Sequence, residues 1–211
     1  MTTSEPYLLI ELHYFPCLEY FTQYFKYNTI VLEGHENYVK QSYRNRCYIL
    51  GANGKLQLTV PVIHGRKKIP IREIQIDHSQ NWLNIHHRSL KSAYGKAPFF
   101  EFYFDFFESV FQKRYKFLFD LNYQLLTVCL KILGLTNSLK ISESYLSNED
   151  GRFSDLRDEI NPKSSFYNRT FYQPKSYHQV FGKDFVNNLS LIDLLMNEGP
   201  NSAAIMRQYT V

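Results

Sequence analysis

Short apolar runs near the start of the chain have the lengths and spacing of strands and of one helix. Residues 8–12 form a short, mainly apolar run that ends at His13-Tyr14-Phe15-Pro16, which is typical of a buried strand that enters a loop. In residues 18–27 apolar side chains recur at helical spacing, and residues 29–33 again have the composition of a strand. The order strand, helix, strand predicts a parallel β-α-β unit.

The next polar and apolar positions predict a β-hairpin. Residues 43–50 and 56–62 flank Gly51-Ala52-Asn53-Gly54, and Asn-Gly between two strand-like segments favours a tight hairpin turn. Apolar and polar residues alternate in the second arm, so one of its faces is expected to be buried. Residues 73–77 predict one further strand.

The rest of the chain is mainly helical in pattern. Residues 81–133 predict two or three helices, interrupted near residues 95–98, where glycine and proline both oppose a continuous helix. A last helix is expected to begin at Ser190, with Asp193 reaching back as in a capping box, and to end at Gly199-Pro200.

Residues 148–175 are polar and almost without periodicity, which predicts a long surface segment. It is interpreted either as a lid over a site or as a disordered insertion. The fold class that follows is mixed α/β: a small mixed sheet with an N-terminal β-α-β unit and a β-hairpin, followed by a mainly helical half. At 211 residues, the chain is expected to form a single domain over residues 1–211, with the lid or loop at about 148–175.

Composition narrows the class of protein. No stretch approaches the roughly 18 apolar residues of a membrane span, and the N-terminus lacks the features of a signal peptide, so a cytoplasmic protein is expected. Cys17, Cys47 and Cys129 are odd in number and scattered, which predicts buried thiols in a reducing compartment. A net charge of +4 is too small and too dispersed to indicate a nucleic-acid binder.

Residues 35–46 form an unusually polar segment between two predicted strands. If this segment is extended, Lys40, Ser42, Arg44 and Arg46 share one face, because side chains alternate along a strand. Three cations at this spacing can hold a phosphate or pyrophosphate. The alternative is a solvated strand face.

Two adjacent histidines are separated by helical geometry. On a helix over residues 81–94, His86 falls within the apolar stripe, whereas His87 falls on the polar side with Lys91. His86 is therefore a candidate general acid or base, and a hydrogen-bonded core histidine is the alternative. No metal-binding spacing, Walker loop or dinucleotide-binding turn is present, so neither a metal nor a cofactor is expected.

The chain resembles the WbqC-like family over nearly its whole length, in the form found in its Bacteroidetes branch. The residues that carry the resemblance are Tyr14-Phe15-Pro16, Tyr20-Phe21, His35-Glu36-Asn37-Tyr38, Arg44-Asn45-Arg46, Leu58-Thr59-Val60-Pro61-Val62, Trp82 with His86, Ser92-Ala93-Tyr94-Gly95-Lys96-Ala97-Pro98-Phe99-Phe100, Asn188-Leu189-Ser190, Ile192-Asp193-Leu194-Leu195 and Asn197-Glu198-Gly199. These pieces are short, but their number and order make a chance match improbable.

The resemblance implies a role in bacterial surface-polysaccharide or O-antigen biosynthesis. The function expected from it is a transferase that modifies a nucleotide-linked or lipid-linked sugar, by amino-acyl or specifically glycyl transfer. The alternative is a non-catalytic protein that binds a glycan precursor or acts as a scaffold in the same pathway. The two differ in geometry: an enzyme needs a histidine in the cleft of the cationic segment, whereas a scaffold favours an exposed apolar patch.

Specific residues are assigned to the transferase hypothesis. His86 takes the proton of the attacking amine or hydroxyl, and His35 with Glu36 is the alternative acid–base pair. The residues expected to bind substrate are Lys40, Arg44 and Arg46 for the phosphates, and Asn45 and Tyr94 for the sugar.

Overall fold

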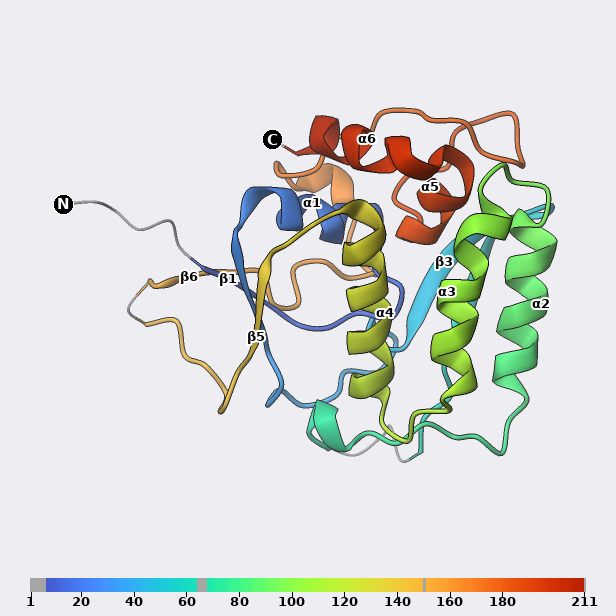
Figure 1. The fold of residues 1–211 in the computed structure, drawn as a ribbon. Coiled ribbons are helices and arrows are strands. Elements are labelled where there is room, and N and C mark those ends of the chain that lie inside the picture. Colours follow the sequence, from blue (N-terminus) through green and yellow to red (C-terminus); the bar gives the residue numbers. More distant parts are fainter. Residues whose placement is uncertain (1–6, 64–67, 150, 211) are drawn as a thin grey trace.

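A four-stranded parallel sheet forms one side of the fold (Figure 1). The structure is a computed structural model and describes residues 7–63, 68–149 and 151–210 (Figure 1). The strands of the sheet are β1 (Tyr7–Ile10), β2 (Thr29–Leu32), β5 (Ser138–Ile141) and β6 (Phe153–Asp155). Their order is β5-β2-β1-β6 and all the pairings are parallel, so β1 and β2 are the inner strands.

The predicted β-α-β unit is confirmed. Helix α1 (Leu18–Lys26) connects β1 to β2, and Leu8 pairs in register with Ile30. Three consecutive residues of β1, Leu8, Leu9 and Ile10, have no exposed surface. An inner strand that is covered on both faces has this continuous apolar sequence, because its side chains point alternately into two packed layers.

The hairpin is also confirmed, although it forms a sheet of its own. It consists of β3 (Arg46–Gly51) and β4 (Gly54–Thr59), with Cys47 opposite Leu58. The tight turn requires a positive φ of 100° at Gly54, which glycine adopts without a steric cost. The alternation in the second arm holds for Leu58, which is buried, but Leu56, which lies near the turn of the hairpin, is 40% exposed.

The prediction of a strand at residues 73–77 is wrong. This segment begins in a 3-10 helix, η1 (Ile71–Glu73), and then makes isolated bridges to two different partners, Gln75 to Phe117 and Ile76 to Val62. Because no single neighbouring strand runs beside it, the segment cannot build a ladder of hydrogen bonds.

Three helices follow, as the pattern indicated. They are α2 (Trp82–Tyr94), α3 (Phe100–Gln112) and α4 (Leu118–Leu133), and the first break falls at the predicted glycine and proline. In Figure 1, α2, α3 and α4 stand side by side next to the hairpin. No helix among the described residues is long and apolar enough to cross a membrane.

The C-terminal region consists of α5 (Leu191–Glu198), the 3-10 turn η3 (Gly199–Asn201) and α6 (Ser202–Tyr209). The hydroxyl of Ser190 accepts a hydrogen bond from the backbone amide of Ile192, so the predicted N-cap is confirmed. Asp193 departs from the capping-box prediction, because its carboxylate accepts hydrogen bonds from two tyrosine hydroxyls instead of the cap amide.

The segment at residues 148–175 is packed against the sheet in this structure. It supplies β6 and the 3-10 turn η2 (Phe166–Asn168), and Ile160 and Tyr172 are buried. Arg157 and Arg169 attach it to buried glutamates of the N-terminal unit. Its role as a lid over a site stays a prediction.

Candidate functional site

Polar side chains gather where the parallel strands end. Glu11 follows β1, Glu33 follows β2, Ser142 follows β5, and Asp155 ends β6. Since parallel strands end at a common edge, these residues are brought together from distant parts of the chain. Open parallel sheets bind their ligands at this edge. We refer to this region as the carboxyl edge.

One half of the carboxyl edge is organised by Arg157. Its guanidinium donates to Glu33 Oε2 at 2.9 Å and to Asp155 Oδ2 at 2.6 Å. Ser142 Oγ donates to Glu33 Oε1 at 2.7 Å, and the backbone amide of His35 donates to the same oxygen at 2.9 Å. Glu33 has no exposed surface and is therefore held by donors from three segments.

The other half is built around Arg44, whose side chain is only 1% exposed. Its Nε and Nη2 donate to the two oxygens of Glu36 at 2.7 and 2.5 Å. Nη2 also donates to Asp158 Oδ1 at 2.8 Å, and Nη1 lies 3.8 Å from Glu11 Oε1. One guanidinium thus faces three carboxylates, and no side is left open for a phosphate.

His13 extends this half into the core. Its Nε2 lies 2.9 Å from Glu11 Oε1, and its ring packs between Tyr20 and Tyr43 with centroid distances of 4.6 and 5.3 Å. Its Nδ1 has no hydrogen-bond partner among the described residues. The Glu11–His13 pair is buried and out of contact with water.

The carboxyl edge has an excess of negative charge. Five carboxylates, those of Glu11, Glu33, Glu36, Asp155 and Asp158, face the two guanidinium groups of Arg44 and Arg157. Such a site attracts a cationic group such as an ammonium more readily than a phosphate.

Burial and neighbouring charges shift the pKa values of two glutamates. Burial raises the pKa of Glu36 to about 7; Arg44 opposes the rise, and Glu11 and Asp158 add to it. Burial also acts to raise the pKa of Glu11, but His13 and Arg44 outweigh it and the pKa of Glu11 is lowered. Two neighbouring carboxyls thus have pKa values pushed apart, an arrangement found in acid–base sites.

The expected phosphate-binding face is not formed, because residues 40–45 are folded into turns and bends and β3 begins only at Arg46. Ser42 Oγ donates to the carbonyl of Val39 at 2.6 Å and accepts from the amide of Arg44, and Gln41 has a φ of 58°. The side chains of residues 40, 42, 44 and 46 therefore do not share one face.

The substrate-binding candidates of this segment are correspondingly dispersed. Lys40 and His35 are exposed, whereas Arg44 is buried. Arg46 is half-buried and its Nη1 donates to Gln57 at 3.4 Å. Asn45 donates to the carbonyl of Val60 at 2.8 Å. Of these candidates, Glu36 and Arg44 are in direct side-chain contact.

His86 points inward and His87 outward, as the helix geometry predicted. His86 Nε2 lies 3.2 Å from the carbonyl oxygen of Thr59, and because a carbonyl only accepts, Nε2 carries the hydrogen. Nδ1 then accepts from the hydroxyl of Tyr14 at 2.8 Å. Burial lowers the pKa of His86 to about 4. Both nitrogens are engaged, which fits the core-histidine alternative.

Tyr94 belongs to a separate buried network. Its hydroxyl donates to Asp193 Oδ1 at 2.9 Å, while Tyr177 and Gln179 donate to Asp193 Oδ2 at 2.5 and 3.0 Å. None of the hydrogen bonds of the Tyr94 hydroxyl described here reaches Arg44 or Glu36.

Most residues of the carboxyl edge were missed by the sequence analysis. Glu11 and Glu33 carried a usable signal, because each is the first polar residue after an apolar strand of a β-α-β unit. No sequence signal marks Asp155, Arg157 and Asp158, because the sequence does not show that their segment adds a strand to the sheet. Among the described residues, no group of three or more His, Cys, Asp or Glu side chains is arranged to hold a metal ion.

A comparison with protein families identifies the chain. The model of the WbqC-like protein family matches residues 12–165 and 165–205. The chain belongs to the WbqC-like protein family. The matched residues include Glu36, Arg44 and Asp158, and the resemblance expected from the sequence is confirmed. Searches of curated proteins and of solved structures find no match to the chain.

Proposed function

We propose that this WbqC-like protein is a transferase that attaches an acyl group, such as glycyl, to the amine of a nucleotide-linked or lipid-linked sugar in surface-polysaccharide biosynthesis in the cytoplasm. The observation that carries the proposal is Glu36, a buried carboxyl with a pKa of about 7 at the carboxyl edge of a parallel sheet. A general base is most effective when its pKa lies near the working pH.

The negative charge of the carboxyl edge supports an amine as the attacking group. Sugar amines are protonated before reaction and are attracted as ammonium ions to a site with surplus carboxylates. Glu36 takes a proton from the ammonium and leaves a neutral nucleophile. Asp158, whose side chain is 65% exposed, lies on the solvent side of Arg44 and would contact the arriving amine first.

The chemical step balances with an activated acyl donor, such as an acyl ester or thioester. The amine nitrogen forms a bond to the acyl carbon, and the bond from that carbon to the leaving oxygen or sulfur breaks. The nitrogen loses two protons in all: the ammonium proton passes through Glu36 to solvent before the attack, and the proton lost as the new bond forms passes to Glu36 and then to the leaving group. Arg44 acts as a positioning residue, because it holds both oxygens of Glu36.

The proposal moves the acid–base role from His86 to Glu36. His86 has both ring nitrogens engaged and a pKa of about 4, so it is neutral and occupied near neutral pH. His35 is exposed beside Glu36 and could relay the proton to solvent. Exposed Lys40 and half-buried Arg46 are retained as contacts for substrate phosphates, and Asn45 and Tyr94 keep structural roles in the proposal.

The experiment is genetic complementation in a strain that lacks this gene, with mass-spectrometric analysis of the surface polysaccharide. Glu36→Gln keeps an oxygen for Arg44 but cannot act as a base, so the protein should stay folded and the acyl modification should be lost. His86→Gln should restore the modification. A fully active Glu36→Gln variant would overturn the proposal, and an inactive, folded His86→Gln variant would return the acid–base role to His86.

Exposed apolar side chains favour a scaffolding role as the second candidate. Ile85 on α2 is 57% exposed, and Phe102 and Phe106, one helical turn apart on α3, are 69% and 46% exposed. If binding to a partner is the function, Phe102→Ser with Phe106→Ser should abolish complementation while Glu36→Gln supports it. The transferase proposal expects the reverse result.

A further inference from the structure

Two buried carboxyl groups face Arg44, and a buried histidine contacts one of them. Glu36 accepts hydrogen bonds from Arg44 at both of its oxygens, at 2.7 and 2.5 Å. Glu11 Oε1 lies 3.8 Å from Nη1 of the same guanidinium, which is too far for a hydrogen bond. His13 lies 2.9 Å from that oxygen of Glu11 and has no exposed surface. The proposed reaction leaves this histidine without a role.

Glu11 depends on donors that Glu36 does not share. Nε2 of His13 contacts Oε1, and the backbone amide of Asp158 donates to Oε2 at 3.2 Å. Burial acts to raise the pKa of Glu11, but His13 and Arg44 outweigh it and the pKa is lowered. Glu11 is therefore ionised, and Nε2 of His13 is the donor in their contact.

The surroundings of His13 make Glu11 its main polar contact. The ring of His13 packs between Tyr20 and Tyr43, with centroid distances of 4.6 and 5.3 Å. Its Nδ1 has no hydrogen-bond partner among the described residues. A buried polar ring with one free nitrogen is costly in a core of aromatic side chains. The interaction that offsets this cost is the hydrogen bond from Nε2 to Glu11.

The other groups around the two glutamates do not exchange protons near neutral pH. Burial raises the pKa of each surrounding tyrosine, so all of them stay neutral: Tyr20, Tyr24, Tyr38 and Tyr43. Asp158 Oδ1 accepts from Arg44 at 2.8 Å, and its side chain is 65% exposed. The negative charge that faces Arg44 therefore resides on Glu11, Glu36 and Asp158.

Two carboxyls beside one guanidinium compete for its charge. When one of them takes up a proton, Arg44 is left to the other, which then holds its negative charge more firmly. The contacts that only one carboxyl has decide which of them is protonated first. The hydrogen bond from His13 favours the charged form of Glu11, so it leaves the first proton to Glu36.

We propose that His13 is a positioning residue for the base of the transferase: by donating to Glu11 it keeps that carboxylate charged, and the exchangeable proton of the pair then belongs to Glu36. The inference rests on the proposed function, in which Glu36 exchanges protons with the substrate amine. It adds a control of the same site, because the histidine selects which of two buried carboxyls acts as the base. His13 acts through Glu11 and Arg44 and does not contact the reacting atoms.

Carbon-13 NMR of protein labelled at the glutamate carboxyl carbons follows these protons directly and needs no substrate. Glu36→Gln and Glu11→Gln assign the two signals, because each variant removes one of them. In the unaltered protein Glu36 should titrate near pH 7, and Glu11 should titrate at a lower pH. The opposite order of the two glutamates would overturn the proposal.

His13→Leu is the decisive variant, because it removes the donor and keeps an apolar side chain between Tyr20 and Tyr43. Glu36 should then titrate lower by about one pH unit, and Glu11 should titrate higher. His13→Gln is the matched variant: its side-chain amide can donate to Glu11, so Glu36 should titrate as in the unaltered protein. An unchanged Glu36 in His13→Leu, or equal shifts in both variants, would overturn the proposal.

Glu11→Gln keeps the proposal testable if the leucine variant does not fold. Glutamine still accepts from His13 but carries no charge beside Arg44, so Glu36 should again titrate at a lower pH. If Glu36 still titrates near pH 7 in this variant, Glu11 does not act on it and the proposal is wrong. The transferase proposal fails separately, through a Glu36→Gln variant that is active in complementation, because the titration of Glu36 is measured without any reaction.

Discussion

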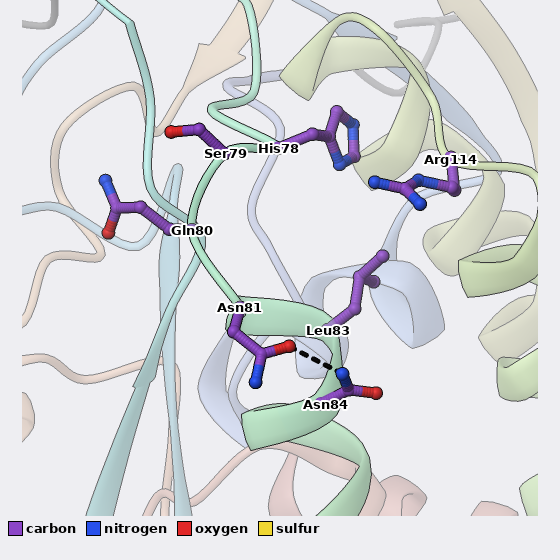
Figure 2. A pocket seen from close by; sticks show the side chains of 7 residues that line it. All are labelled: His78, Ser79, Gln80, Asn81, Leu83, Asn84 and Arg114. Atoms are coloured by element: carbon purple, nitrogen blue, oxygen red, sulfur yellow. Dashed lines mark hydrogen bonds between the residues drawn. The ribbon is translucent and has the colours of Figure 1, made fainter.

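Arg44 and Arg114 have the same side chain and opposite situations. Arg44 is 1% exposed and its guanidinium is surrounded by Glu11, Glu36 and Asp158. Arg114 is exposed just after α3, at a polar hollow on the surface (Figure 2). Its guanidinium has no hydrogen-bond or ion-pair partner among the described residues. One region is saturated with internal contacts and the other is not.

The difference shows that the state of pairing decides what an arginine can do. A guanidinium whose donors are used by carboxylates cannot bind phosphate, however basic the surrounding sequence is. Its role is to orient carboxylates and to hold segments together. An unpaired guanidinium at the surface holds no segment and leaves its donors to solvent. The next four experiments test this contrast, from the largest expected effect to the smallest.

Replacing Arg44 should have the largest effect on stability. Arg44→Ala leaves three carboxylates facing one another in a buried site, and breaking a buried ion pair in this way costs about 3–5 kcal/mol. Urea denaturation of the variant measures the loss. Lys40→Ala, at an exposed position four residues earlier, should change stability by less than about 0.5 kcal/mol. Similar losses for the two variants would mean that the buried cluster is not a structural unit.

The two histidines of α2 extend the same contrast to neutral groups. His86→Ala removes both hydrogen bonds of a buried ring and leaves a cavity, and we expect a loss of about 2–4 kcal/mol. His87, which is half-buried beside Glu108, should tolerate alanine within about 0.5 kcal/mol. Thermal unfolding of both variants gives the comparison, and a larger loss for His87→Ala would contradict it.

Stability should also depend on pH through His86. Burial lowers its pKa from 6.5 to about 4, so between these values the unfolded chain binds more protons than the folded one. The contribution of the neutral His86 ring to stability is therefore complete above 6.5, the pKa of histidine in the unfolded chain. It is lost as the pH falls toward 4, by up to about 3 kcal/mol.

His86→Gln isolates this contribution, because glutamine does not titrate. The stability difference between the unaltered protein and the variant should shrink as the pH is lowered from 6.5 to 4. A difference that stays constant over this range would show that the ring is charged or accessible in the folded protein. The stability contribution of Glu36 has the opposite pH dependence, because its pKa is raised. This contribution is present at low pH and is lost as the pH rises toward 7.

The smallest effect is expected at Arg114. Arg114→Gly relieves a left-handed backbone conformation, but glycine also gains freedom in the unfolded chain, so the two effects nearly cancel and stability should change by less than about 0.5 kcal/mol. Chemical denaturation checks this. A loss comparable to that of Arg44→Ala would mean that Arg114 is part of the packed structure and not an unpaired surface charge.

Local signals in the sequence predicted the local parts of the fold. The β-α-β unit, the Asn-Gly hairpin and the inward orientation of His86 each depend on residues within one or two neighbouring elements, and all three are confirmed. Strands β5 and β6 could not be found in this way. Both are short and partly polar, and they are strands only because β2 and β1 present free edges to them.

The site was harder to predict than the fold for a related reason. Alternation along an extended segment placed Lys40, Arg44 and Arg46 together, but the hydroxyl of Ser42 stabilises a turn that breaks the alternation. The partner that decides the role of Arg44, Asp158, lies in the segment with the least pattern in the sequence. Contacts between distant residues therefore determined the site, and no single-sequence period encodes them.

The position of β1 in the sheet has a consequence for synthesis. β1 pairs on one side with β2, but its other partner is β6, where Tyr7 lies beside Phe153. While the chain grows on the ribosome, one edge of an entirely apolar strand stays open until most of the protein has been made. Such an edge is a template for wrong pairing with other chains, and closing it requires a contact over a very long sequence separation, which is slow. Nascent chains that end before β6 are therefore expected to depend on chaperones more than the finished protein does.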